Sequence, residues 1–281
     1  MSREKFTLSK LPAYCGMYLV MLFTALVSVG PLVWVVISSF KTNFEIMDSP
    51  FALPSSISFT AYREVIAIGN FFTFAWNSFL YSTVATITAL ILYSMSAFVF
   101  AKYRFPFKGL LYVLMIITML IPGHSRVQPI FSLIVNGGLF DTRMGIIIVY
   151  ITGGLAMSLF VLRAAFSSIP NEISEAATID GAGFVRNFIQ MHLPLAKSGL
   201  ATAGILMWLG HWNEYFWASL LTTSARTRTL PYALSFFMDM FAINYTRMFA
   251  ALTMVIIPGI VIYALTQEQV QMSIAGSSVK G

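Results

Sequence analysis

Between Asn171 and Pro194 the chain reads NEISEAATIDGAGFVRNFIQMHLP. This polar stretch separates two apolar runs, and its local chemistry predicts two short helices joined by a sharp bend. Asn171 is a suitable N-cap for the first helix, and the acidic residues that follow it would lie near the positive end of the helix dipole. Gly181 can end that helix in the left-handed region, and Pro194 would begin or kink the next helix.

The same stretch is built so that another surface can approach it closely. Ala176, Ala177 and Ala182 have minimal side chains, which leave the backbone accessible. Glu175 and Asp180 can offer carboxylates to a partner. Local chemistry alone leaves two interpretations open, a docking surface for another protein and an ordinary solvated helix that lies on lipid headgroups.

Composition identifies the kind of protein to which this stretch belongs. The chain has 281 residues, of which 58% are hydrophobic and only 10% are charged. Soluble domains carry about 25% charged residues, so we expect an integral protein of the lipid bilayer. The net charge of +6 comes from basic residues scattered among short loops, which argues against a nucleic-acid partner. Cys15 is the single cysteine and excludes an intrachain disulfide.

The hydropathy pattern predicts an all-α membrane protein with six transmembrane helices in one domain, 14–281, after a cytoplasmic N-terminal segment, 1–13. A helix needs roughly 20 apolar residues to cross a bilayer. The expected spans are 14–39, 74–100, 110–135, 145–162, 200–221 and 248–265, with a break in the third at Pro122 and Gly123. Two long polar segments, 41–73 and 222–247, are expected to be exposed loops, and 267–281 is a polar tail.

Basic residues in the loops orient these spans. Lysine and arginine concentrate in cytoplasmic loops, and the short second loop carries Lys102, Arg104 and Lys108. This places both termini in the cytoplasm, together with the 166–198 loop between the fourth and fifth spans.

The loop resembles that of a known family. Glu175-Ala176-Ala177, Asp180-Gly181-Ala182, Phe184, Phe188 and Leu193-Pro194 stand at the spacing of the signature loop in permease subunits of ATP-binding-cassette importers, the binding-protein-dependent transport inner-membrane components. The ending 277–281 resembles that of the smaller, maltose-permease-like subunit of carbohydrate importers, although 267–276 departs from the usual pattern.

The resemblance implies that 166–198 forms cytoplasmic coupling helices that fit a groove on an ATPase subunit. The residues that it assigns to ATPase coupling are Glu175, Ala176, Ala177, Asp180, Gly181, Ala182, Phe184 and Pro194. The implied partners are a second homologous permease subunit in a heterodimer, two copies of an ATPase and an extracytoplasmic solute-binding protein. The implied location is the cell membrane, or inner membrane, of a bacterium or archaeon.

The chain is not expected to be an enzyme. It has no Gly-rich phosphate loop followed by Gly-Lys-Ser/Thr, so we expect MgATP to bind the partner ATPase subunits and no cofactor to bind this chain. No catalytic residues are assigned. The three histidines show no metal-ligand spacing, and no metal site is expected.

Polar groups within apolar runs are candidates for the substrate pathway, because such groups usually face a cavity or a partner. The candidates are Asn77, His124, Arg126, Gln128, Asn213, Glu214 and Tyr215. For Asn77 the alternative is hydrogen bonding between helices. For the group near Pro122 the alternative is a position at the outer headgroups, and for the group after Trp212 it is anchoring at the membrane interface.

The loop 222–247, with Arg228-Thr229-Leu230-Pro231, resembles the outer loop that meets the binding protein in carbohydrate importers. The candidates for that contact are Arg228, Phe236, Phe237 and Met240. Exposed aromatic residues suit a partner interface, and the alternative is that they lie back on the bilayer.

The resemblance implies that the chain is the permease of a sugar or oligosaccharide importer that works by alternating access. A non-sugar solute such as a glycerophosphodiester is the alternative within the family. A secondary transporter or channel is the alternative outside it. The signature loop argues against this second alternative, because a transporter without an ATPase has no use for such a loop. A membrane-embedded enzyme lacks any constellation of reactive groups.

Overall fold

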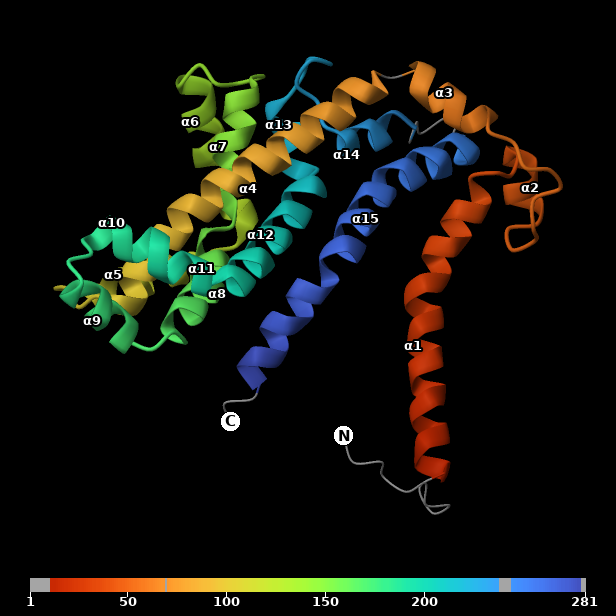
Figure 1. The fold of residues 1–281 in the computed structure, drawn as a ribbon. Coiled ribbons are helices and arrows are strands. Elements are labelled where there is room, and N and C mark those ends of the chain that lie inside the picture. The colour runs from red at the N-terminus through yellow and green to blue at the C-terminus, as the bar shows by residue number, and fades with distance from the viewer. Residues whose placement is uncertain (1–10, 69, 238–243, 279–281) are drawn as a thin grey trace. The chain divides into compact units, whose positions relative to one another are not determined.

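The computed structural model describes residues 11–68, 70–237 and 244–278, and all regular elements within these ranges are helices (Figure 1). The chain divides into two compact units. The first comprises Met1–Gly69 and Phe236–Met254, and the second comprises Asn70–Ser235 and Val255–Gly281.

The first unit contains α1 (Leu11–Ser38), α2 (Asn43–Asp48), α3 (Thr60–Ile68) and the first turns of α15 (Tyr245–Ser278). Helix α2 begins with a capping box, in which the Thr42 hydroxyl accepts from the Glu45 backbone N–H and the Glu45 carboxylate accepts from the Thr42 N–H. Hydrogen bonds from the Ser55 side chain, and further ones from Thr42, lower the pKa of Glu45 to about 2. The carboxylate therefore stays charged and holds the loop around α2.

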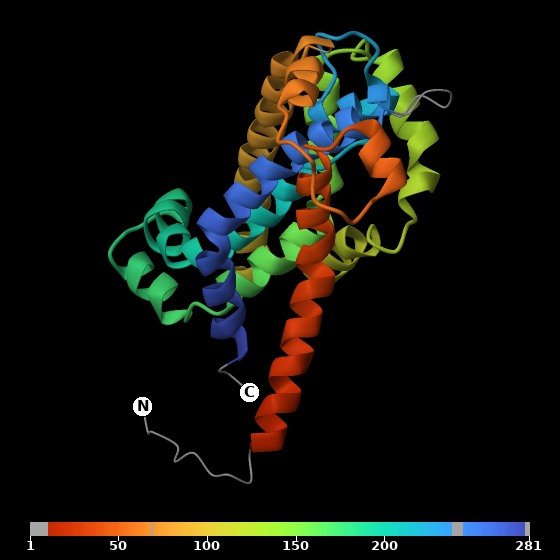
Figure 2. The same cartoon turned by 90° about the vertical axis from the view of Figure 1, so that its right-hand side faces the viewer.

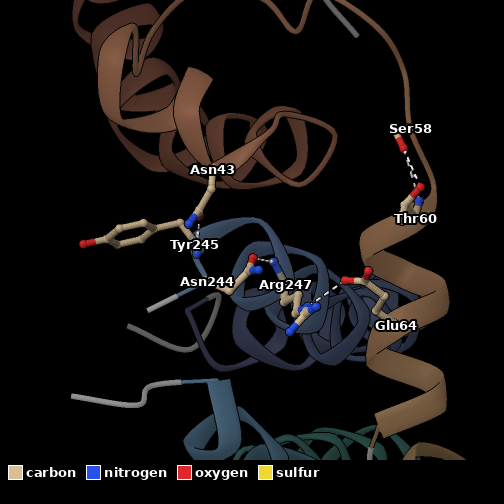
Figure 3. A network of polar contacts seen from close by, with 7 residues as sticks. All are labelled: Asn43, Ser58, Thr60, Glu64, Asn244, Tyr245 and Arg247. Atoms are coloured by element: carbon tan, nitrogen blue, oxygen red, sulfur yellow. Dashed lines mark hydrogen bonds and ion pairs between the residues drawn. The ribbon is translucent and has the colours of Figure 1, made fainter. Parts of the chain in front are cut away.

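A polar network joins α2, α3 and the start of α15 (Figure 3). Arg247 Nε donates to the Glu64 carboxylate at 2.6 Å. The side-chain oxygen of Asn43 accepts from the Tyr245 backbone N–H at 2.8 Å, and that of Asn244 accepts from the Arg247 N–H at 3.0 Å. The polar segment after α1 is therefore a folded part of the first unit.

In the second unit, the central element is α4 (Phe71–Lys102), which packs against α7 (Arg143–Gly153), α8 (Leu155–Ser167) and α12 (Lys197–Trp212). Small buried residues on α4, including Ala85, Ala89 and Ala97, let these neighbours approach its backbone. Helices α8 and α12 also approach each other closely, because a Cβ added at Gly199 would overlap the Ala165 side chain. The remaining elements of this unit before α15 are α5 (Lys108–Ile117), η2 (Gly123–Arg126), α6 (Val127–Asn136), α9 (Glu172–Ile179), α10 (Phe184–Arg186), η3 (Asn187–His192), α11 (Leu193–Leu195), α13 (Phe216–Leu221), α14 (Leu230–Ala233) and η4 (Leu234–Phe237).

Three helices are long and apolar enough to cross a membrane, and they cover Tyr14–Ser38, Phe71–Lys102 and Tyr245–Leu265. Two further pairs qualify if each bent pair is one span. One is Arg143–Gly153 with Leu155–Ser167, bent by 52°, and the other is Phe184–Leu195 with Lys197–Trp212, bent by 80°. The described residues thus contain three candidate spans, or up to five.

Two of the predicted spans, 145–162 and 200–221, are interrupted where the sequence predicts no break, and the span 110–135 is broken before Gly123 as the sequence predicts. The predicted span 145–162 breaks where Gly153 meets Gly154, since two adjacent glycines favour a helix poorly. The predicted span 200–221 ends as α12 at Trp212 and resumes as α13 at Phe216. The predicted span 110–135 consists of α5, which ends before Pro122, and the short helices η2 and α6. By contrast, α1 is one helix with Pro31 inside it.

Candidate functional site

Helix α9 and the segment after it lie beside the C-terminal end of α4, as both views of the fold show (Figures 1 and 2). After Asp180 the chain reverses at Gly181, whose φ of +77° lies in the left-handed region, as the sequence predicts. The Ala182 N–H donates to the Ala177 carbonyl at 2.8 Å and closes the end of the helix. The bend is therefore fixed by backbone geometry that suits glycine.

Asn171 lies at the predicted N-cap position of α9, but its side chain does not cap the helix. Its backbone is helical, with φ −72° and ψ −24°, and its side chain makes no capping bond. Instead, its side-chain oxygen accepts from Lys102 Nζ at 3.1 Å, and the same ammonium donates to the Ile169 carbonyl. The ammonium at the end of α4 needs oxygen acceptors, and it takes the Asn171 oxygen that would otherwise cap α9.

A cluster of rings joins α4 to the segment after α9. Phe98 is fully buried near the end of α4. Ring centroids from five residues lie 4.9–5.8 Å from its own, and these residues are Tyr103, Phe166, Phe184, Phe188 and His192. Because protein interiors are close-packed, α4 and this segment must move together or the cluster must repack.

The segment from α10 to α11 is continuous and includes a π-helical stretch, η3. Pro194 lies in the short helix α11, and the chain bends after it, before α12 begins at Lys197. π-Helical turns are uncommon and often lie at functional positions.

Most residues that the resemblance assigned to ATPase coupling are accessible on this segment. The exposed ones are Glu175, Ala176, Asp180, Gly181, Phe184 and Pro194, and Ala182 is half-buried. Ala177 is buried, so its side chain offers little surface to a partner. Ile179, which the sequence reasoning did not select, is 86% exposed at the end of α9.

At the other end of α4, polar side chains bind the backbone of the loop after α13. Asn77 is fully buried, and its Nδ2 donates to the carbonyls of Arg226 and Arg228 at 2.9 Å each. Tyr81 donates to the Thr227 carbonyl at 3.1 Å. The Ser78 hydroxyl accepts from the Leu230 N–H at 2.8 Å. The donor groups of the Asn77 amide are thus engaged within the chain.

Asp141 binds the same loop from the turn between α6 and α7. Its carboxylate accepts from the backbone N–H groups of Thr223 and Ser224 at 3.0 and 3.1 Å, and from the Thr227 hydroxyl. Partial burial opposes ionisation of the Asp141 carboxyl. The hydrogen bonds from Thr227, Thr223 and Ser224 outweigh burial and hold its pKa well below the usual range.

The sequence predicted that the loop 222–247 is exposed, and this is wrong for part of the loop. Thr222, Thr227, Thr229 and Leu230 are buried. Asp141 accepts from the Thr227 hydroxyl, and Ser78 on α4 accepts from the Leu230 N–H, so these two polar groups have partners within the chain. The Arg228 guanidinium lies 4.4 Å from the centre of the Tyr232 ring. The backbones of Phe236 and Phe237 lie in η4 but their side chains are not described, and Met240 lies outside the described residues.

A pocket of about 410 Å³ lies in the second unit where α7 meets α8, and α12 borders it. His211 lies at its wall, with Nδ1 3.0 Å from the Thr86 hydroxyl and Nε2 3.0 Å from the Tyr150 carbonyl. The His211 ring stacks on Tyr150 at 5.3 Å. Glu214 also borders the pocket, and its carboxylate accepts from the N–H groups of Trp217 and Ala218.

The other pathway candidates lie apart from this pocket's lining. Asn213 donates to the Leu209 carbonyl at 2.9 Å, and Tyr215 stacks on Tyr232. Gln128 is exposed, and the Nε of Arg126 is buried without a hydrogen-bond partner among the described residues. The side chain of His124 is outside the description. Among the candidates whose side chains the structure describes, it brings only Glu214 to this pocket.

Sequence reasoning missed several residues that organise these sites. The sequence reasoning treated Lys102 only as a basic loop residue and did not single out Asp141. Their hydrogen-bond partners, such as Asn171 and Thr223, are distant in sequence and are brought near only by the fold. His192 and His211 carried no metal-ligand spacing, and within the described residues no group of three metal-ligating side chains occurs. The adjacent glycines at 153 and 154 were the available signal for the break beside the pocket.

Comparison with known proteins places these features in a family. Residues 94–271, more than half of the chain, match the model of the binding-protein-dependent transport system inner membrane component. The chain belongs to this family. This permease is thus an integral membrane protein of the ATP-binding-cassette transporter class.

Relatives extend the likeness over nearly the whole permease. It is 33% identical to the diacetylchitobiose uptake system permease protein NgcG of Streptomyces coelicolor, over 92% of this chain and 85% of that one. It is 29% identical to the sn-glycerol-3-phosphate transport system permease protein UgpE of Brucella melitensis, over 89% and 92%. Its fold is similar to a chain of a bacterial transporter that imports the acidic polysaccharide alginate, with a TM-score of 0.82, 26% identity, and coverage of 94% and 99%.

Proposed function

We propose that this permease is a transmembrane subunit of an ATP-driven importer for a sugar or oligosaccharide that a solute-binding protein delivers. The likeness to diacetylchitobiose and alginate transporters supports the substrate class. The observation that carries the mechanism is the folded segment around α9, which is exposed on one side and locked to α4 on the other.

In this proposal α9 docks on an ATPase subunit through its exposed residues. When ATP closes the ATPase dimer, the docked helix is displaced. Lys102 and the rings around Phe98 pass that displacement to α4. ATP supplies the energy through its higher affinity for the closed ATPase dimer, so the connection must be stiff enough to shift the permease between its two states.

Helix α4 is suited to carry the movement to the outer side. Asn77 and Phe98 are separated along one continuous helix by about 30 Å, roughly the thickness of a bilayer core. At its other end the same helix binds the backbone carbonyls of Arg226 and Arg228 through Asn77. A rigid-body movement of α4 would therefore change the docking surface and the outer loop together, as alternating access requires.

The proposal includes the substrate path and the membrane topology. The pocket beside His211 and Glu214 forms this chain's share of the path, since it combines aromatic walls with polar groups at a break between helices. Six spans result if α7 with α8 and α12 with α13 each form one span and α5 to α6 supplies the remaining one. Both termini then lie in the cytoplasm of a bacterial or archaeal cell, and the membrane is the cell or inner membrane.

The remaining partners follow from the same proposal. A second, homologous permease subunit completes a heterodimer, and two ATPase subunits bind MgATP. The extracytoplasmic binding protein meets the outer loop near Arg228, whose guanidinium is held on Tyr232.

Purification tests this assembly. The permease, tagged at its N-terminus, is extracted from its host membranes in mild detergent, and its partners are identified by mass spectrometry. We expect a second permease, an ATPase and a binding protein. In a Glu175→Lys variant the ATPase should be lost selectively, because the exposed carboxylate is replaced by a positive charge. Isolation of the permease alone, in a stable form, would favour a secondary transporter or channel.

The second candidate substrate is a phosphorylated glycerol compound such as a glycerophosphodiester. The likeness to the Brucella glycerol-3-phosphate permease favours it. The binding protein recovered with the complex separates the two candidates. Thermal stabilisation of that protein by sugars and not by glycerol phosphates would support the first proposal, and the reverse would support the second.

A further inference from the structure

His192 is a fully buried histidine in η3 that contacts two other elements. Its Nε2 lies 3.1 Å from the Ser174 hydroxyl on α9. Its ring centroid lies 4.9 Å from that of Phe98 on α4. The Nδ1 atom lies 3.3 Å from the Asn187 carbonyl one turn earlier in its own segment. One side chain of η3 therefore contacts both α9 and α4.

The two hydrogen bonds fix how the ring is protonated. A backbone carbonyl can only accept, so Nδ1 carries the hydrogen and donates to Asn187. In a neutral ring Nε2 is then an acceptor, and the Ser174 hydroxyl donates to it. Both polar atoms of this buried ring are thus satisfied only when Ser174 is present on α9.

Helix α9 has few other ties to the protein. It is eight residues long, and its apolar contacts inward come from Ile173 and Ala177. Lys102 holds the chain just before the helix, through Ile169 and Asn171. A helix this short is not stable alone, so its position depends on these contacts. The hydrogen bond between Ser174 and His192, in contrast, involves a residue of α9 itself.

We propose that His192 is a positioning residue that locks α9 to α4, so that movement of the docked helix reaches the membrane helices without slack. This rests on the proposed function, since the locking matters only if α9 couples to an ATPase. A residue that merely filled the space would be replaceable by an apolar side chain of similar size. A residue that positions α9 needs an acceptor for the Ser174 hydroxyl.

The test uses the complete complex in proteoliposomes, with its ATPase and binding protein, and measures solute imported per ATP hydrolysed. His192→Leu keeps the bulk and removes the acceptor, and we expect the ratio to fall about fivefold, as for loss of one buried hydrogen bond. His192→Gln offers an amide oxygen to Ser174 and should restore most of the ratio. Ser174→Ala, which removes only the hydroxyl, should match His192→Leu.

The double variant Ser174→Ala/His192→Leu should be no worse than either single variant, because both remove one interaction. An unchanged ratio in an assembled His192→Leu complex would overturn the inference. So would a His192→Gln complex that couples no better than His192→Leu, or additive losses in the double variant.

A second readout separates this inference from the proposed function. Amide hydrogen exchange over 172–179 should be faster in His192→Leu and near the parent rate in His192→Gln, whether or not the complex transports. Unchanged exchange in His192→Leu would overturn the positioning role. A parent complex that shows no ATP-dependent import would overturn the proposed function instead.

Discussion

The Asn77 amide donates a hydrogen bond of 2.9 Å to the backbone carbonyl of Arg228. It bonds the Arg226 carbonyl in the same way, so one side chain of α4 holds two points of the loop after α13. At the far end of α4, Lys102 holds the residues before α9. One helix thus carries fixed attachments to both segments that we propose to bind partners.

The first prediction concerns the outer attachment. Asn77→Ala leaves two partly buried carbonyls without their donors, which should destabilise the protein by about 2 kcal/mol. The thermal midpoint of the purified complex measures this loss. Ser96→Ala on the same helix is the control, because the Ser96 hydroxyl only bonds the Leu92 carbonyl of its own helix. Equal midpoints for the two variants would contradict the anchoring role of Asn77.

The second prediction concerns the turn after α9. Gly181→Val places a branched side chain at φ +77°, where L-residues pay about 1–2 kcal/mol or more, and ATP-driven uptake should fall sharply. Gly183→Val is the matched control, since both glycines have open space around a Cβ but Gly183 has φ −69°. The protein level in membranes should stay similar in both variants. Normal uptake by Gly181→Val would show that this turn need not be rigid.

The third prediction concerns Asp141. Its pKa is lowered in the folded protein, so the stabilisation is complete above the unfolded value of about 3.9 and is lost only as the pH falls toward the folded value. Asp141→Asn removes the charge that the loop N–H groups bind. We expect it to lower stability by about 2 kcal/mol, with the same difference at pH 5.5 and pH 8. A difference that shrank between pH 8 and pH 5.5 would contradict the lowered pKa.

The fourth prediction concerns the ion pair between Glu64 and Arg247 in the first unit. The two side chains are 39% and 36% exposed, so solvent screens their attraction. Glu64→Gln should therefore change stability by less than about 1 kcal/mol, and high salt should reduce the difference further. Unfolding measured at low and high salt tests this. A large, salt-independent loss would mean that the pair acts through more than its exposed contact.

The fifth prediction concerns His192 and pH. Burial is the main cause that lowers the pKa of this ring. The folded state therefore favours neutral His192, and its contribution is complete above about 6.5 and lost as the pH falls below that value. The titratable groups on the neighbouring elements are Lys102 on α4, whose charge also disfavours protonation, and Glu172 and Glu175 on α9.

Amide exchange over 172–179, measured from pH 7.5 to pH 5.5, checks this. After correction for intrinsic rates, the parent should lose protection as the pH falls, whereas His192→Gln should not. Loss of protection that is equal in both proteins would assign the effect to another group.

The sequence predicted the helical class and the bend at Gly181 because both depend on local composition. Apolar runs predict membrane helices directly. A glycine between a short helix and a polar turn predicts a residue with a left-handed backbone conformation. The residue types that suit docking were also readable, since exposure of Glu175 and Asp180 follows from their charge.

The contacts of Asn171 and Ala177 could not be read in the same way. Asn171 has the chemistry of an N-cap, but Lys102, 69 residues earlier, claims its oxygen. Ala177 has the size of a docking residue, but the fold turns it inward. For Asn171 a partner distant in sequence decided the outcome, and no local pattern names that partner.

The central claim is that α9 docks on an ATPase subunit. A photo-crosslinking amino acid at Ile179, which is 86% exposed, tests it most directly, with the 79% exposed Leu120 as the control position. In membranes of the native host, we predict a crosslink from position 179 to an ATPase chain and none from position 120. A permease that assembles and transports, yet gives no ATPase crosslink from position 179, would contradict the account.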